Sequence, residues 1–120
     1  STNGQRTATA VQLTSTMGTD PVFRSAFAKA QSGEEDSWTE DEALAFWFFS
    51  GASFQTYADA YWHYKNGFIP QDRWLAVLAE LKNGMTNIPA FRTRVENTFH
   101  LSGPVRQMVD EIIFEIDSSE

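Results

Sequence analysis

Cysteine is absent from this 120-residue chain, which excludes disulfide bonds, thiolate zinc sites and a cysteine nucleophile. Hydrophobic runs are short: no stretch approaches the ~20 apolar residues of a membrane-spanning helix, and no signal-peptide core is present. The chain also lacks a glycine-rich phosphate loop before a Lys-Ser/Thr pair and the Gly-x-Ser-x-Gly elbow of serine hydrolases. These absences favour a protein that is not an enzyme, with no catalytic residues, no metal and no cofactor.

Positive charge is scarce. Nine Lys and Arg residues stand against 16 Asp and Glu residues, which gives a formal net charge of −7. The cations are scattered along the chain, whereas nucleic-acid binding needs a basic face that releases counterions. We therefore expect no nucleic-acid partner, and binding to acidic membrane surfaces is disfavoured for the same reason.

Helix start and stop signals dominate the chain, and no strand-like alternation competes with them. Asp20 before Pro21 is an N-cap signal, and Thr39 with Glu42 forms a capping box. Gly33 and Gly67 are the expected left-handed stops. The pattern predicts six helices, over residues 5–17, 21–32, 39–66, 70–83, 87–99 and 102–116. The fold class is all-α, a compact bundle in which residues 1–18 form a polar connector helix and residues 19–120 a single helical domain.

The helix over residues 39–66 is long and rich in aromatic rings. Nine of the seventeen aromatic residues lie between Phe46 and Tyr64. One apolar stripe at helical spacing comprises Leu44, Trp47, Phe48, Gly51, Ala58, Tyr61 and Trp62. A helix that is apolar over most of its circumference is usually buried on several sides. We therefore expect this helix to be the centre of the bundle, with Gly51 and Ala58 leaving room for neighbouring helices.

Three roles are open for these rings: core packing, the lining of a ligand pocket, and a surface for a partner or a second copy of the chain. Core packing alone accounts for them, because ring pairs add about 0.5–1.5 kcal/mol beyond the area that they bury. Some of the rings also carry a polar atom that needs a hydrogen-bond partner when buried. The candidate ligand-binding residues are therefore Tyr57, Tyr61, Trp62 and Tyr64.

Asp59 and His63 are spaced i, i+4 on the same helix, so both side chains lie on one face. This spacing suits a shared metal, or a carboxylate that orients an imidazole as a general base. A metal needs further ligands, however, and His100 is the only other histidine. A simple polar pair, which stabilises a helix by a few tenths of a kcal/mol, explains the spacing equally well.

The order of these signals resembles an uncharacterised bacterial family of membrane-anchored all-helical domains. The resemblance spans most of the chain and depends on aromatic and capping residues. The matching stretches are Gln5-Arg6-Thr7, Asp20-Pro21, Thr39-Glu40-Asp41-Glu42, Tyr61-x-x-Tyr64-x-x-Gly67-Phe68-Ile69 followed by Trp74, and Phe99-x-x-Ser102. The chain departs from the family pattern at Ala58, where members often carry Glu, and at His63, where they often carry Gln.

The resemblance implies topology rather than activity. It places a membrane helix before Ser1 and this domain on the cytoplasmic face of the bacterial inner membrane. Our leading hypothesis is a non-enzymatic interaction or scaffolding domain that contacts a protein partner or forms a homodimer. The alternative is a sensor that binds an apolar or aromatic small molecule within the bundle. A metal-dependent hydrolase using Asp59 and His63 is the third hypothesis.

Overall fold

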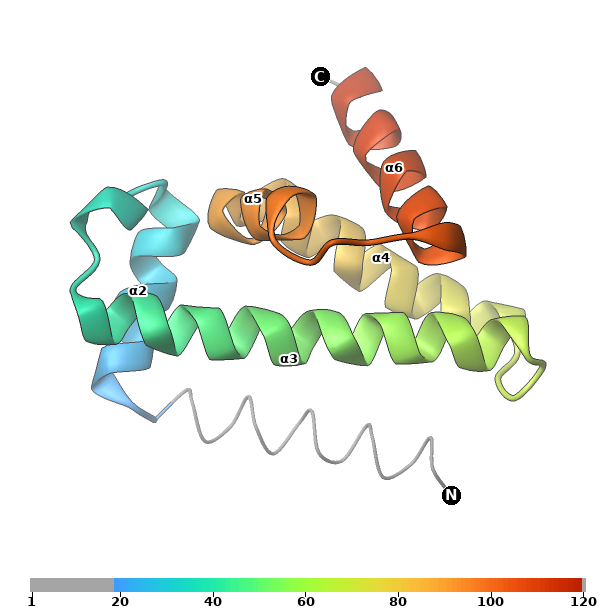
Figure 1. The fold of residues 1–120 in the computed structure, drawn as a ribbon, viewed down its shortest axis with the longest axis horizontal. Helices are drawn as coiled ribbons and strands as arrows, with labels where there is room; N and C mark the ends of the chain where they lie inside the picture. Colours follow the sequence, from blue (N-terminus) through green and yellow to red (C-terminus); the bar gives the residue numbers. More distant parts are fainter. Residues whose placement is uncertain (1–18, 120) are drawn as a thin grey trace.

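The computed structural model describes residues 19–119, which form five α-helices and one short 3-10 turn, with no β-strand among them (Figure 1). The elements are α2 (Pro21–Ser32), η1 (Glu35–Ser37), α3 (Glu40–Lys65), α4 (Gln71–Asn87), α5 (Pro89–Asn97) and α6 (Gly103–Ser118). The all-α prediction is confirmed for these residues. The predicted connector over residues 1–18 lies outside the described part of the chain.

The predicted start signals form the expected hydrogen bonds. The Asp20 carboxylate accepts from the Val22 amide at 2.8 Å, so it satisfies a free donor at the start of α2. At α3, the Glu42 amide donates to the Thr39 hydroxyl at 3.1 Å, and the Thr39 amide donates to the Glu42 carboxylate at 2.8 Å. This reciprocal pair is the predicted capping box.

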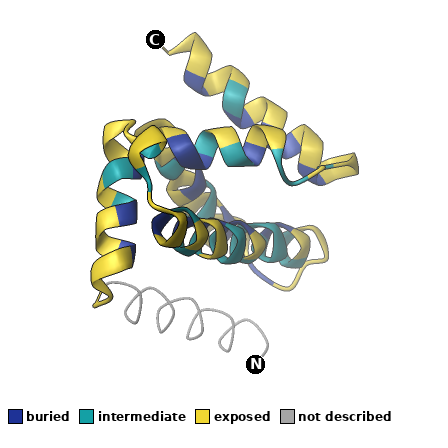
Figure 2. Cartoon of the chain, turned by 60° about the vertical axis from the view of Figure 1, so that its left-hand side comes forward, coloured by how far each residue is buried: buried dark blue, intermediate teal, exposed yellow. Residues whose placement is uncertain are grey.

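The longest helix, α3, has 26 residues and runs along one edge of the molecule (Figure 1). Its partners pack along its length: α2 crosses it near its N-terminal end, α4 lies near its C-terminal end, and α5 lies between them. The last helix, α6, makes its main backbone contacts with α4. Figure 2, coloured by burial, shows that the helices have a buried side and an exposed side, as amphipathic helices do around a shared core.

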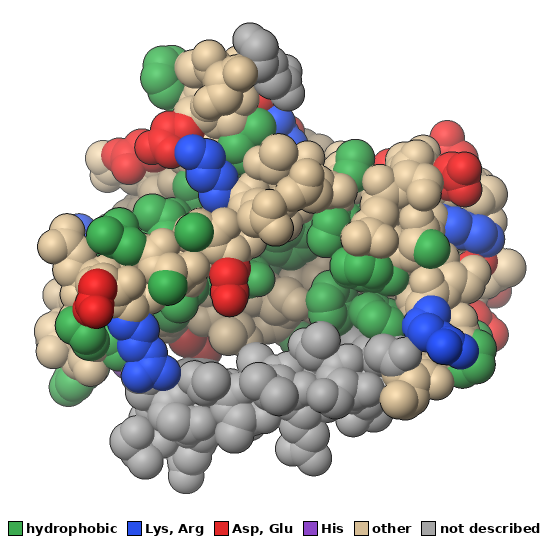
Figure 3. All heavy atoms as spheres, turned by 180° about the vertical axis from the view of Figure 1, so that it is seen from behind, with side chains coloured by type: hydrophobic (Ala, Val, Ile, Leu, Met, Phe, Trp, Pro, Cys, Tyr) green, Lys and Arg blue, Asp and Glu red, His purple; other side chains and the backbone are tan. Residues whose placement is uncertain are grey.

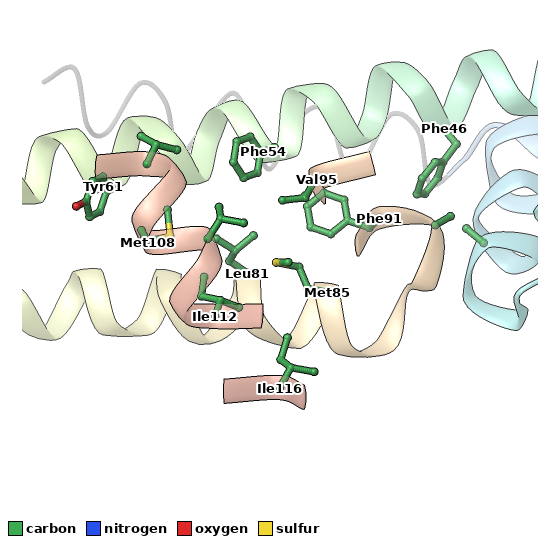
Figure 4. Packing of buried hydrophobic residues seen from close by; sticks show 14 of the residues in the cluster. Phe46, Phe54, Tyr61, Leu81, Met85, Phe91, Val95, Met108, Ile112 and Ile116 are labelled. Carbon is green, nitrogen blue, oxygen red and sulfur yellow. The ribbon is translucent and has the colours of Figure 1, made fainter. Parts of the chain in front are cut away.

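The hydrophobic core lies between α3 and the other helices (Figure 4). Leu81 and Met85 of α4 and Val95 of α5 are almost completely buried. Burying each side chain of this size contributes about 1.5–3 kcal/mol relative to leaving it exposed. They meet rings from α3 and aliphatic side chains from α6, including Phe46, Phe54, Tyr61, Met108, Ile112 and Ile116.

The prediction that α3 is enclosed on several sides is wrong for one strip along the helix. The strip includes four residues that were expected to face inward and are 53%, 49%, 61% and 45% exposed: Leu44, Trp47, Phe48 and Trp62. The buried row consists of Glu42, Phe46, Ser50, Phe54 and Tyr61. Because each residue turns a helix by about 100°, these two rows lie on different sides of α3. The partners of α3 pack against the second row and the residues beside it, such as Phe49, which contacts Phe23 of α2.

Two predicted boundaries near α5 are also wrong. Gly84 does not end α4, which continues to Asn87, so Asn87 belongs to α4 and does not cap α5. The following helix begins with Pro89 at its first position, where a missing amide hydrogen costs nothing. Phe99 lies beyond the end of α5, in a loop where His100 has a φ of 47°, and stacks on Phe54 at 4.7 Å between ring centroids.

Candidate functional site

The exposed side of α3 carries a regular row of residues that we call the outer face. Its members follow each other in alternating steps of four and three: Leu44, Phe48, Gly51, Gln55, Ala58 and Trp62. Large exposed apolar residues lie at both ends, and the middle holds the exposed amide of Gln55 with two small, half-buried residues, Gly51 beside Arg94 and Ala58 against the core. Alternating steps of four and three keep residues in line along a helix that packs against another helix. The outer face therefore has the geometry of a helix-packing surface.

One edge of the outer face is held by Arg94, which reaches from α5 to α3. Its guanidinium lies 3.6 Å from the centroid of the Trp47 ring and 4.4 Å from that of Phe99, so it is sandwiched between two aromatic faces. It donates hydrogen bonds to the Ser50 hydroxyl and, at 3.1 Å, to the Trp47 carbonyl. Burial lowers the pKa of Arg94 below its ordinary value.

Gly51 lies beside this guanidinium. A Cβ atom at position 51 would lie 3.0 Å from Nη2 of Arg94, which is closer than ordinary side-chain contact. Glycine therefore provides the room in which Arg94 lies across α3. The expectation that a small residue at position 51 allows close approach is correct, although the approaching group is a side chain of α5.

The N-terminal end of α3 holds a partly buried charge cluster around Glu42. The Glu42 side chain accepts from the Lys29 ammonium at 2.8 Å, from the Ser25 hydroxyl and from the Thr39 amide. The hydrogen bond from Lys29 is the largest cause of a pKa lowered to about 2, followed by those from Ser25 and Thr39, with burial opposing them. These partners are internal, so the cluster stabilises the α2–α3 contact.

The four predicted ligand-binding residues do not form one site. Tyr61 and Tyr64 both pack on Trp74 of α4, with ring centroids 5.2 Å and 5.8 Å from it. Tyr57 is half-buried, and burial, assisted by the charge of Glu80, raises the pKa of its hydroxyl. Trp62 is on the outer face. The structure therefore brings together two of the four.

Tyr61, Tyr64 and Trp74 line a cleft of about 460 Å3 between α3, α4 and α6. Its apolar walls continue with Leu78 of α4 and Met108 of α6. The rim is charged, with lining residues that include Lys65, Lys82, Glu111 and Glu115. Lys82 and Glu115 form an ion pair at 2.8 Å that links α4 to α6 across the cleft.

Asp59 and His63 lie one turn apart on α3, as predicted, and both are half-buried. The Asp59 carboxylate accepts from the Gln55 side-chain amide at 3.1 Å. The His63 ring is edge-on to Phe68, and its Nδ1 atom is buried with no hydrogen-bond partner in residues 19–119. Nowhere in that range do three His, Cys, Asp or Glu side chains come together as a metal site. The pair therefore lacks the third ligand that metal chemistry needs.

Sequence reasoning missed Arg94 as a structural residue. The only signal for it was a glycine within a ring-rich helix, which indicates close approach but does not say which group approaches. The partly buried salt bridge between Lys29 and Glu42 was also missed, because the capping box alone accounted for Glu42.

Comparison of this chain with known protein families, curated proteins and solved structures finds no match. Within residues 19–119, no helix is long and apolar enough to cross a lipid bilayer. Figure 3, which views the molecule from behind, shows hydrophobic side chains at the surface and Lys and Arg side chains in separate places on that side.

Proposed function

We propose that this chain is a non-enzymatic interaction domain that binds a protein helix through the outer face of α3. The observation that carries the proposal is the exposure of Leu44, Phe48 and Trp62 in one row at the spacing of helix-packing residues. Single exposed apolar residues are common in soluble proteins, whereas several aligned on one helix support an interaction surface there.

The expected occupant is an amphipathic helix with an apolar stripe of its own. A helix is the element that fits the alternating steps of the outer face, since its own side chains recur with the same period. The rigid anchors of such a contact are Phe48 and Trp62, because aromatic side chains dominate the binding energy of interfaces. A membrane tether before Ser1, which the family resemblance implies, is a separate part of this proposal.

A photo-cross-linking amino acid at position 48 tests the proposal in the cells that naturally make the protein. We expect an adduct whose mapped peptide comes from an amphipathic helix, and we expect Leu44→Glu to abolish it. The matched control carries the same amino acid at position 114, because Phe114 is 73% exposed but lies on α6. If position 48 gives no protein adduct, or if Leu44→Glu leaves the adduct unchanged, the outer face is not the interaction surface.

A second candidate function is the binding of a planar aromatic molecule in the cleft between α3, α4 and α6. It is favoured by the aromatic wall formed by Tyr61, Tyr64 and Trp74, since ligand sites combine apolar walls with a few polar groups. Indole is a suitable probe, and calorimetry would measure its binding. We expect Leu78→Trp to fill the cleft and abolish binding, while Leu75→Ala, a change at a half-exposed lining residue, weakens it less. Equal binding of indole by the Leu78→Trp variant would exclude the cleft.

A further inference from the structure

The outer face continues with the same steps to charged residues at both ends. Asp41 lies three residues before Leu44, and Lys65 lies three residues after Trp62. Both charged residues are exposed. We call the whole row of eight the α3 seam: Asp41, Leu44, Phe48, Gly51, Gln55, Ala58, Trp62 and Lys65. Its acidic and basic ends are roughly 36 Å apart at 1.5 Å per residue.

We propose that the helix bound by the outer face is α3 of a second copy of this chain, packed antiparallel about a two-fold axis at the level of residue 53. This inference rests on the function proposed above and names its partner. In that register every seam residue meets another seam residue. The opposing pairs are Asp41 with Lys65, Leu44 with Trp62, Phe48 with Ala58, and Gly51 with Gln55.

The sizes of the side chains agree with this pairing. Phe48 meets Ala58, so a large residue faces a small, half-buried one. Gln55 meets Gly51 where the Arg94 guanidinium already lies beside the glycine, so this central pair is a polar contact next to Arg94. Alternation of large and small residues lets facing layers interdigitate at native density. Next to the charged ends of the seam, Leu44 packs against Trp62, so an aliphatic side chain lies on an aromatic ring.

The charges select the same orientation. Antiparallel pairing places Asp41 against Lys65 at both ends of the interface, whereas parallel pairing in register places like charges against each other. The helix dipoles agree, because the N-terminal end of α3 also carries Glu40 and meets the C-terminal end of its partner. Complementary charges fix register and suppress the wrong arrangement.

The exposed apolar area indicates a weak dimer. An aromatic side chain presents roughly 150–250 Å2, so the exposed parts of Phe48 and Trp62 each offer on the order of 100 Å2. With Leu44 and the stems of the polar seam residues, the contact stays below the about 1,200 Å2 in total that specific interfaces bury, in the range of transient contacts. We therefore expect a dissociation constant in the micromolar range rather than a permanent dimer.

Sedimentation velocity from micromolar to millimolar concentration tests the dimer. We expect the wild-type protein to shift from monomer to dimer and Phe48→Glu to weaken this association by about 30-fold or more. Phe48 is mostly exposed, so its variant should fold normally, which circular dichroism checks. The matched control is Phe114→Glu, which places the same charge on α6 and should leave association unchanged. A wild-type monomer at all concentrations overturns the inference, as does equal weakening by both variants.

Engineered cysteines test the orientation in this cysteine-free chain. In the antiparallel dimer, a mixture of Asp41→Cys and Lys65→Cys proteins forms a mixed disulfide under mild oxidation. Neither protein forms one alone, because equivalent positions lie roughly 36 Å apart along the seam. Disulfides formed by each protein alone, without the mixed product, would show parallel pairing and overturn the proposed register.

The photo-cross-linking experiment separates this inference from the function on which it rests. Adducts from position 48 that map to residues around Ala58 of a second copy support both. Adducts that map to a helix of another protein overturn self-association and leave the interaction function standing. Adducts within residues 1–18 of the same molecule show that the outer face is occupied internally and overturn both.

Discussion

Replacing Arg94 by alanine tests how α5 is held against the exposed edge of α3. The change removes a guanidinium stacked 3.6 Å from Trp47 and 4.4 Å from Phe99. A cation on an aromatic face contributes about 0.5–1 kcal/mol when exposed and about 2 kcal/mol when desolvated. Arg94 is half-buried, so we take about 1 kcal/mol for each ring.

The hydrogen bonds of Arg94 add to the stabilisation that stacking provides, whereas the burial of its guanidinium reduces that stabilisation. Bonds from a charged donor to the Trp47 carbonyl and the Ser50 hydroxyl contribute about 1.5–3 kcal/mol each. Against them stands the cost of burying Nη1, which has no partner within residues 19–119, at about 1–3 kcal/mol. The Ser50 hydroxyl keeps its hydrogen bond to the Phe46 carbonyl at 2.8 Å, so Arg94→Ala leaves no unpaired polar group at Ser50. The net expectation is a loss of about 2–7 kcal/mol in the free energy of unfolding.

Urea unfolding followed by circular dichroism measures the loss. The matched variant is Arg94→Lys, which keeps the charge but not the planar stack, and should recover less than half of the stability. A double-mutant cycle with Trp47→Ala isolates the stacking on the indole, because alanine keeps the backbone carbonyl at position 47, with an expected coupling of about 1 kcal/mol. A loss below about 0.5 kcal/mol for Arg94→Ala, or full recovery by lysine, would refute the proposed role of the stacked guanidinium.

Three further changes test the core, a helix and a charge. Leu81→Ala empties a completely buried site and should cost about 2–5 kcal/mol in urea unfolding; a loss within 0.5 kcal/mol would mean that the site is not packed as described. Gly84→Ala should stabilise α4 by about 0.5–1 kcal/mol, because alanine favours helix and its Cβ would lie 3.6 Å from Phe91, an ordinary contact; a lower melting temperature would contradict this. The pKa of Glu42 is about 2 in the folded state against an ordinary value of 4.5, so its stabilisation is present above pH 4.5 and is lost as the pH falls towards 2. Melting of Glu42→Gln across that range should therefore depend less on pH than melting of the wild-type protein, and parallel curves would argue against the lowered pKa.

The sequence predicted the helices well because their ends carry local chemistry. Asp20, Thr39 and Gly67 act through bonds and backbone angles within a few residues, so their effects are readable without tertiary structure. The failure at Gly84 has the opposite cause. A glycine costs a helix only about 1 kcal/mol, and contacts of α4 with the core outweigh that cost.

The sequence alone did not show which side of α3 faces the core. Two apolar rows run along this helix, one through Leu44 and Phe48 and the other through Phe46 and Phe54. Both are rich in rings, so hydrophobicity does not rank them, and the buried row even begins with the carboxylate of Glu42. Which row is buried depends on where α2, α4 and α5 pack, and that is decided by contacts between residues far apart in the chain. The predicted stripe contained every outer-face residue except Gln55, but it also contained Trp47 and the buried Tyr61, and its direction was wrong.

The attachment of α6 to the rest of the molecule has a consequence for motion. Its main backbone contacts are with one neighbour, α4, and the ion pair between Arg92 and Asp117 adds a tie to α5, so we expect α6 to be the helix that separates first. Amide protons of α6 should therefore exchange with solvent sooner than those in the middle of α3, through an opening that costs less than global unfolding. Since Met108 forms one wall of the cleft and Tyr61 another, each such opening would expose the floor of that cleft to water.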